Sequence, residues 1–518
     1  MSQTFQLYLT ADPILQQECI TTLNAKFQTD VEPWYSDPKG NFKYFFRLKT
    51  SDNKNKWRIA KEIKDAHKGV IEVDPVIFLT GQTGAYESDE DYPEPGNVKW
   101  NHSITKFPEA IQKSVSDGKL DINTGTVTRI AHFDTGITKH PELPDFKERG
   151  YNFVEENDDI TDMMNDGLFK HPGHGTGTAS VIVGLQQTEN NDFNNGVFPY
   201  TSLIPYRIAK SVVHFVNSNI DEAILHAVKK GVDVITMSMG GAPPRRSWKE
   251  AVKFAYDNGV IFCCAAGNNV QFVVWPAAYD EVLAIAAINV NKEPWEGSCR
   301  GNTVDASAPG ENVYVARSKK DNTEMIFDQG FGSGTSFAVP HVAAAAVLWL
   351  NHFKDEIAEA IEKPSDKVDL FRTALKLSVQ PHKNNNYTTE YGPGILDAYK
   401  LLDFSPKIIK QQYPDEYQKS KSISRQGRGF GNAGQEYNLI QKEMLDLMVN
   451  KDHVDYSSMI EFIREEATPD AKNAFDNLMP LAPAPAQNQS SEGTRAMKAE
   501  ELNHARALFA TEIIAGNF

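Results

Sequence analysis

The hydrophobic and polar positions of the first 80 residues alternate between strand-like and helix-like patterns. Aromatic and β-branched residues alternate with polar ones in the strand-like runs, whereas the helix-like runs repeat apolar residues every three to four positions. The runs lie at residues 5–10, 13–27, 42–50, 57–67 and 70–79. Their order is strand, helix, strand, helix, strand. It predicts a small α+β, ferredoxin-like module over residues 1–80, with helices on one face of a sheet.

A second pattern covers the middle of the chain. Residues 81–97 are rich in Gly, Pro and acidic side chains, so we expect an exposed linker. From residue 98 to 403, near-continuous apolar runs alternate with helical ones, which predicts an α/β domain with a parallel sheet buried on both faces. The strand-like runs are 126–133, 203–208, 232–237, 259–265 and 282–287, and the helix-like runs are 219–230, 247–258 and 335–350.

The pattern weakens after Phe404. Residues 407–428 are polar and mildly basic, which favours a solvated, flexible connector over a site for an anionic partner. Residues 436–480 and 494–515 have helical patterns, separated by a Pro/Ala/Ser linker at 481–493. The segment 404–518 is therefore expected to be a helical or disordered extension. It has three open roles: binding a regulatory partner, covering a cleft, or being a second processed segment.

Composition narrows the classes of function. The 518 residues include 53 Lys and Arg against 69 Asp and Glu, a net charge of −16, which argues against nucleic acid as the main partner. The four cysteines are too few for a disulfide scaffold, and Cys263 and Cys264 stand in an apolar run typical of a core. No secretory signal is visible, and no apolar run is long enough to span a bilayer. We expect a cytoplasmic protein that uses no membrane.

Three segments of the middle domain carry candidate chemistry. Asp134 ends an apolar strand and is followed by a turn at Gly136, where open α/β sheets place their sites. His174 stands between glycines at the start of an apolar helix, in His-Pro-Gly-His-Gly-Thr-Gly. Ser336 falls in the first turn of an Ala-rich helix, where unpaired N–H groups favour negative charge. Taken singly, each is better explained without a catalytic role: Asp134 as an ordinary strand end, His174 as a capping or core histidine, and Ser336 as a helix cap.

Together the segments follow the chain order Asp, His, Ser of subtilisin. The blocks Asp-Thr-Gly-Ile with His-Pro-Glu-Leu, His-Gly-Thr-Gly-Thr-Ala, and Gly-Thr-Ser-Phe-Ala-Val-Pro-His resemble the three signature blocks of the subtilisin-like serine proteases. Ser-Met-Gly-Gly at 238–241 and Ala-Ala-Gly-Asn at 265–268 agree, as do Ala-Pro-Gly at 308–310 and Tyr-Gly-Pro-Gly-Ile-Leu-Asp at 391–397. The resemblance covers residues 98–403.

The resemblance implies a serine endopeptidase acting on proteins or peptides without a required cofactor. Ser336 would be the nucleophile, His174 the general base and acid, and Asp134 the partner of the imidazole. Asn268, with the Ser336 N–H, would stabilise the oxyanion. Substrate backbone would add as a strand along Ser238, Met239, Gly240 and Gly241. Calcium is implied at the level of the family, but no motif in this chain assigns its ligands.

Some features depart from the family or stay open. Six residues separate Asn268 from Trp275, where a longer loop is common, so Phe272, Val273 and Val274 are expected to narrow the pocket for the residue before the scissile bond. Residues 1–80 resemble an inhibitory pro-region, with self-cleavage within 80–97; the alternative is a permanent accessory domain. The competing functions are a catalytically silent or latent subtilase fold that binds peptides as a scaffold, and a non-protease acyl hydrolase.

Overall fold

The structure of the protein is a computed structural model. Its described residues fall into two compact units, residues 3–75 and residues 98–426. The described ranges are 3–34, 42–51, 56–75, 98–162, 164, 172–185, 196–209, 213–214, 219–241, 246–268, 273–321 and 324–426. The expected linker at 81–97 and the expected helices after residue 428 lie outside these ranges.

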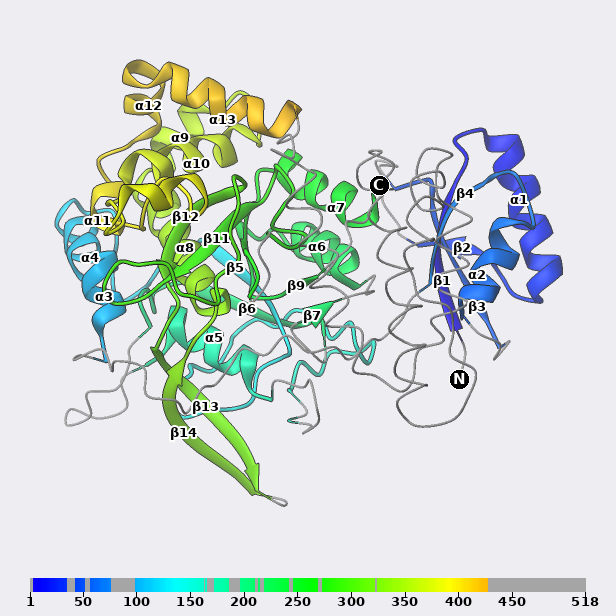
Figure 1. Ribbon diagram of the computed structural model, residues 1–518, viewed down its shortest axis with the longest axis horizontal. Helices are drawn as coiled ribbons and strands as arrows, with labels where there is room; N and C mark the ends of the chain where they lie inside the picture. Colours follow the sequence, from blue (N-terminus) through cyan, green and yellow to red (C-terminus); the bar gives the residue numbers. More distant parts are fainter. Residues whose placement is uncertain are drawn as a thin grey trace, which may run out of the picture. The chain divides into compact units, whose positions relative to one another are not determined.

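The first unit is a four-stranded antiparallel sheet with two helices (Figure 1). Its elements are β1 (Gln3–Leu9), α1 (Pro13–Phe27), β2 (Glu32–Pro33), β3 (Phe45–Thr50), α2 (Lys56–Lys64) and β4 (Val70–Pro75). The strand order β2-β3-β1-β4 and the sequence β-α-β-β-α-β are ferredoxin-like, as predicted, and the short strand β2, which the sequence pattern missed, completes that sequence. Asp12 begins α1 by accepting hydrogen bonds from the N–H groups of Ile14 and Leu15.

The second unit is built on a six-stranded parallel sheet in the order β12-β11-β10-β8-β5-β6. The strands are β5 (Arg129–Asp134), β6 (Ser202–Arg207), β8 (Val234–Met237), β10 (Ile261–Ala265), β11 (Leu283–Ile288) and β12 (Val304–Pro309). Five were predicted, and β12 was missed. The chain runs from β5 to one side for β6 and to the other side for β8. The carboxyl end of β5 is therefore the switch point at which such sheets bind ligands.

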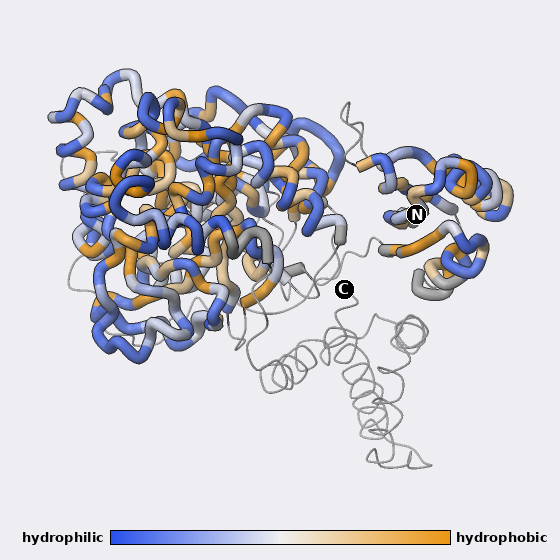
Figure 2. The backbone as a smooth tube through the Cα atoms, turned by 90° about the horizontal axis from the view of Figure 1, so that it is seen from above, coloured by the Kyte–Doolittle hydropathy of each residue, from blue (hydrophilic) through white to orange (hydrophobic). Residues whose placement is uncertain are grey.

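Helices flank this sheet. They are α3 (Trp100–Thr105), α4 (Phe107–Ser116), α5 (His174–Val183), α6 (Asn219–Lys229), α7 (Arg246–Asp257), α8 (Thr335–His352), α9 (Lys354–Ala360), α10 (Asp366–Ser378) and α11 (Ala398–Leu401), with a 3-10 turn at Asn385–Thr389. Hydrophobic segments gather inside the unit and hydrophilic ones outside (Figure 2). Helix α8 packs on β8, β10, β11 and β12 and is buried along almost its whole length, as expected for a core helix.

Among the described helices, none alone has the length and apolar composition to cross a membrane, and only the bent pair α8 and α9 meets that test jointly. The four cysteines are buried and unbridged. Burial raises the pKa of both Cys263 and Cys264, which agrees with the core role predicted for them.

Two smaller pairs complete the unit. β13 (Val313–Asp321) and β14 (Glu324–Gly332) form a long antiparallel hairpin that projects from the sheet domain (Figure 1). β7 (Val213–His214) and β9 (Gly240–Gly241) form a short parallel pair. Neither pair was predicted.

The connector expected over residues 407–428 is wrong for its described part. Residues 406–426 form α12 (Pro406–Gln412) and α13 (Pro414–Gln426), which pack on the second unit. Ile409 and Tyr417 are buried in its core. Polar contacts add to this packing: Lys421 Nζ lies 3.0 Å from Asp366 Oδ1, and Thr373 donates to Ser420 at 2.9 Å. A polar helix is thus ordered by partners that lie far away in the sequence.

Candidate active site

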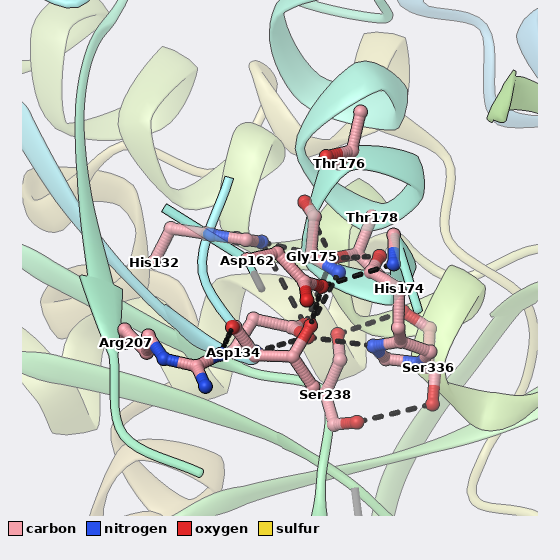
Figure 3. A network of polar contacts seen from close by, with 12 residues as sticks. His132, Asp134, Asp162, His174, Gly175, Thr176, Thr178, Arg207, Ser238 and Ser336 are labelled. Atoms are coloured by element: carbon pink, nitrogen blue, oxygen red, sulfur yellow. Dashed lines mark hydrogen bonds and ion pairs between the residues drawn. The ribbon is translucent and has the colours of Figure 1, made fainter. Parts of the chain in front are cut away.

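Asp134 lies at the carboxyl end of β5, at the switch point of the sheet, and is fully buried. Its Oδ1 accepts hydrogen bonds from His174 Nδ1 at 2.7 Å and from the Thr135 N–H at 2.8 Å. Its Oδ2 accepts from Thr178 Oγ1 at 2.9 Å (Figure 3). Because the carboxylate can only accept, the proton of the neutral imidazole stands on Nδ1, and Nε2 is left as the basic atom.

The electrostatics of this pair favour an ionised Asp134. Burial alone would raise its pKa, but attraction to His174 and His132 and hydrogen bonds from His174 and Thr135 hold the pKa below its usual value. Burial lowers the pKa of His132 to about 4, so this second histidine is neutral at physiological pH. His132 Nε2 lies 2.8 Å from Thr178 Oγ1 and 3.8 Å from Asp134 Oδ2.

His174 is the first residue of α5, and its place depends on the glycines that flank it. Gly173 has φ 75°, a left-handed conformation that favours glycine. A Cβ on Gly175 would lie 2.1 Å from the carbonyl oxygen of Gly136, so the two turns that carry Asp134 and His174 can approach only without a side chain there. On its other side, the His174 ring packs against Phe337, with centroids 6.1 Å apart.

Ser336 is the second residue of α8 and is buried. Its position directly before Phe337, together with the packing of α5 on α8, brings it to the His174 side of the site (Figure 3). Ser336 Oγ donates to the carbonyl oxygen of Ser238 at 3.1 Å, and Ser238 Oγ donates to the Ser336 carbonyl at 2.8 Å. These two bonds tie the start of α8 to the end of β8.

Asn268 follows β10 and is fixed by Thr335. Its Oδ1 accepts from the Thr335 N–H at 2.9 Å and from Thr335 Oγ1 at 2.8 Å. A backbone N–H can only donate, so the oxygen of the amide must face Thr335 and the Nδ2 group must point elsewhere. A Cβ on Gly334 would lie 3.1 Å from Asn268 Nδ2, which places this donor beside the turn that leads into Ser336.

The expected substrate strand is already paired within the chain. Ser238 and the buried Met239 follow β8, and β9 comprises Gly240 and Gly241. β9 pairs in parallel with β7 along one edge. On the other side, Gly241 and Trp275 exchange two backbone hydrogen bonds of 2.9 Å. An added strand at this edge therefore requires β7 to separate from β9.

Val274 lies between the segment that the sequence assigned to substrate binding, 238–241, and the segment that it assigned to the oxyanion, 265–268. A Cβ on Gly240 would lie 2.6 Å from Val274 Cγ2, and one on Gly267 would lie 2.9 Å from Val274 Cγ1. The isopropyl group thus fills the space between these glycines. Val273 turns away toward Gly301, 3.7 Å from the position of its Cβ, and Phe272 lies outside the described residues.

The structure thus brings the sequence-predicted Asp134, His174, Ser336 and Asn268 to the carboxyl edge of one sheet. Sequence reasoning missed Thr178 and Thr335. Thr178 could have been found, because it follows His174 by four residues and so shares its helix face. In the described part of the chain, no group of three or more His, Cys, Asp or Glu side chains is placed to hold a metal ion, so we assign no calcium ligands.

Comparison with known proteins agrees with this geometry. A family model described as the subtilase family matches residues 125–394. The chain is 29% identical over 306 residues to the major intracellular serine protease of Bacillus subtilis, covering 57% of this chain and 88% of that protein. It is 27% identical to an intracellular serine protease of Paenibacillus polymyxa, covering 56% and 86%.

A protease structure from Pseudoalteromonas arctica PAMC 21717 has the same fold, with a TM-score of 0.50 at 22% identity, and covers 60% of this chain and 98% of that one. The family model itself spans more than half of the present sequence. The chain therefore belongs to the subtilase family of serine proteases.

Proposed function

We propose that the protein is a serine endopeptidase that acts through an acyl-enzyme formed on Ser336. The observation that carries the proposal is the hydrogen bond of 2.7 Å from His174 Nδ1 to the buried Asp134, on the side of the site where α8 presents Ser336. The family membership of the chain and the protease relatives support the same reaction.

In the proposed reaction, Ser336 Oγ leaves the Ser238 carbonyl and attacks the carbonyl carbon of the substrate, while its proton passes to His174 Nε2. Asp134 keeps the imidazole in the required tautomer and stabilises the imidazolium. Asn268 Nδ2 and the Ser336 N–H donate to the oxyanion. His174 then gives the proton to the leaving amine, and water hydrolyses the ester on Ser336. These steps use groups of this chain and water.

A serine-directed fluorophosphonate tests this assignment. We expect the reagent to label the folded full chain once, on Ser336, because this is the serine that, among the described residues, lies beside a base and an oxyanion site. Hydrolysis of an unfolded substrate protein should fall in proportion to the labelled fraction of Ser336. Peptide mapping measures the labelling, and the appearance of new N-termini in the substrate measures the hydrolysis. Peptide hydrolysis that persists when Ser336 is fully labelled would contradict the proposal. An unlabelled protein that hydrolyses esters but no peptides would contradict it as well.

The N-terminal unit is proposed to be a pro-region that Ser336 cleaves within residues 80–97. Its ferredoxin-like fold and its place before the sheet domain support this role. The names of the intracellular relatives and the unbridged cysteines support action inside the cell. Residues 404–518 are proposed to bind a regulatory partner. Because α12 and α13 pack on the sheet domain, we assign this binding to the part of the segment beyond α13.

One observation favours the alternative of a latent protein. The edge of β9 that would bind substrate as an added strand is held by β7. A latent form would label slowly with the fluorophosphonate until a partner or a peptide displaces β7, whereas a working protease would label at once.

Val274 is proposed to favour small or medium apolar side chains at the residue before the scissile bond, because its methyl groups fill the space between Gly240 and Gly267. Replacing Val274 with Gly is expected to raise kcat/KM for peptides with Phe there, relative to Ala, by about 10- to 200-fold. Cleavage profiling of a peptide library measures the change.

Val273→Gly is the matched control, since Val273 faces Gly301 instead. It should leave the profile unchanged. An equal shift in both variants would show that Val274 does not form the restriction. A wild-type preference for Arg or Lys would rule out the small pocket altogether.

A further inference from the structure

We propose that Asp162 is a positioning residue for the reaction, because its carboxylate joins the turn after Asp134 to the turn before His174. This inference rests on the proposed serine peptidase function. Asp162 lies in the loop between β5 and α5, outside every block that resembles the family, and is 6% exposed. Its Oδ2 accepts hydrogen bonds from Thr135 Oγ1 at 2.8 Å and from the Gly173 N–H at 2.9 Å.

Thr135 extends this bridge to the other side of His174. Its Oγ1 accepts from the Gly175 N–H at 3.2 Å. Because a backbone N–H already donates to this oxygen, the single hydroxyl proton is the one given to Asp162. The Thr135 N–H meanwhile donates to Asp134 Oδ1. The two residues that flank His174 are thus held by one carboxylate and one hydroxyl, which are themselves bonded to each other.

The hydrogen bonds of Asp162 and Thr135 stabilise the left-handed backbone conformation at Gly173, which few residues adopt readily. Gly173 has φ 75° and begins α5 with no side-chain cap, so the bond from its N–H to Asp162 helps to set the entry into the helix. On the Asp134 side, the Thr135 carbonyl accepts from Arg207 Nη1, and Arg207 Nε pairs with Glu155 at 3.0 Å. Asp162 Oδ1 also accepts from the Met164 N–H at 3.0 Å, which fixes the rotation of the carboxylate.

This geometry separates positioning from chemistry. Asp162 bonds to neither His174 nor Ser336 in the described contacts, so it acts on the reaction by fixing the backbone that carries the His174 ring. Loss of the bridge lets that ring drift from Asp134, and a displacement of about 1 Å costs a rate on the order of 10²-fold. The substrate-binding residues are held by other contacts, those of β9 with Trp275 and of Asn268 with Thr335. The effect should therefore fall on kcat rather than on KM.

The test compares Asp162→Ala, Asp162→Asn and Asp159→Ala in the full-length chain. Asp162→Ala removes every acceptor and is expected to lower kcat by about 10- to 100-fold, with KM changed less than about threefold. Asp162→Asn keeps an oxygen that can accept from Thr135 and Gly173 but turns its NH₂ group toward the Met164 N–H, so its kcat should fall less than that of Asp162→Ala. Asp159 lies on the same loop but is exposed, and its carboxylate bonds only Thr161 among the described contacts. Its loss should leave kcat unchanged.

A second readout does not depend on turnover. The proton between His174 Nδ1 and Asp134 gives a downfield imidazole resonance in the NMR spectrum of histidine-labelled protein. We expect this resonance in the wild type and in Asp162→Asn, and its shift or loss in Asp162→Ala with thermal unfolding still cooperative.

An unchanged resonance and kcat in folded Asp162→Ala would overturn the positioning role. If the wild type does not cleave peptides, the proposed function fails, and the resonance alone then decides the role of Asp162. If Asp162→Ala does not fold, Asp162→Asn decides: a large fall in its kcat together with loss of the resonance would show that the bridge needs the charge, whereas a fall in kcat with the resonance intact would overturn the positioning role.

Discussion

Replacing Ser336 with Ala is expected to lower kcat for peptide hydrolysis by about 10⁶-fold, the size found when the nucleophile is removed from subtilisin. The variant loses the one oxygen that α8 presents beside His174, while the donors for the oxyanion stay in place. A residual rate of about 10³- to 10⁴-fold over water should therefore remain. KM should change little, because the contacts of Gly240 and Gly241 do not involve the serine hydroxyl.

Single-turnover kinetics on a chromogenic peptide measure this loss, and Ser378→Ala is the matched control. Ser378 is a buried serine at the end of α10 whose hydroxyl donates to the Leu375 carbonyl at 3.0 Å, and no described contact joins it to the site residues. It should keep wild-type kcat. A fall of less than about tenfold in folded Ser336→Ala would remove Ser336 from the chemistry.

The same variant also tests processing. If Ser336 cleaves the linker, the wild type should lose about the first 80 to 97 residues on incubation, and Ser336→Ala should keep its full mass. Intact mass and N-terminal sequencing separate the outcomes. Loss of the segment in both forms would assign the cleavage to another protease, and retention in both would leave residues 1–80 as a permanent domain.

The sequence predicted most of the sheet and of the site because both depend on local patterns. Continuous apolar runs mark buried parallel strands, and each chemical residue stands at a strand end or a helix start. Asp134, His174 and Ser336 are recognisable for this reason. β12 was not predicted because its run Val-Asp-Ala-Ser-Ala-Pro alternates small and polar residues. In the structure the strand is buried, and Asp305 within it pairs with Arg372.

The missed parts depend on contacts between distant segments. Asp162 has no helical or strand pattern around it. Its carboxylate accepts from the N–H groups of Gly173 and Met164 and from the Thr135 hydroxyl, and folding is what brings Thr135 and Gly173 to it. The polar sequence of α13 predicts a connector, yet Lys421 pairs with Asp366 and Ser420 accepts from Thr373, and both partners lie on α10. Hydrophobic periodicity detects apolar burial, and it does not detect a polar segment held by specific hydrogen bonds.

Replacing Asp134 with Asn is expected to lower kcat by up to about 10⁴-fold, the loss found for the same change in a serine protease where the imidazole tautomer is also reversed. Asp134 Oδ1 accepts from both the Thr135 N–H and His174 Nδ1, so the amide oxygen of the variant should settle there and its NH₂ group should face Thr178. Thr178 can turn its proton toward His132 Nε2, 2.8 Å away, so the new amide fits without a clash of donors. The imidazole tautomer is then kept, and the loss comes from the missing charge beside the imidazolium.

Asp305→Asn is the matched control for this change, because Asp305 is also a fully buried carboxylate of the same sheet, lying 3.4 Å from Arg372 Nε and 3.2 Å from Lys376 Nζ. It should lower the free energy of unfolding, because it leaves a buried guanidinium less well paired, yet keep kcat of the folded fraction. Asp134→Asn should instead lower kcat of the folded fraction, because the charge that it removes stabilises the imidazolium of His174 during the reaction. Equal kcat losses in the two variants, measured per folded molecule, would mean that a buried charge rather than its place beside His174 sets the rate.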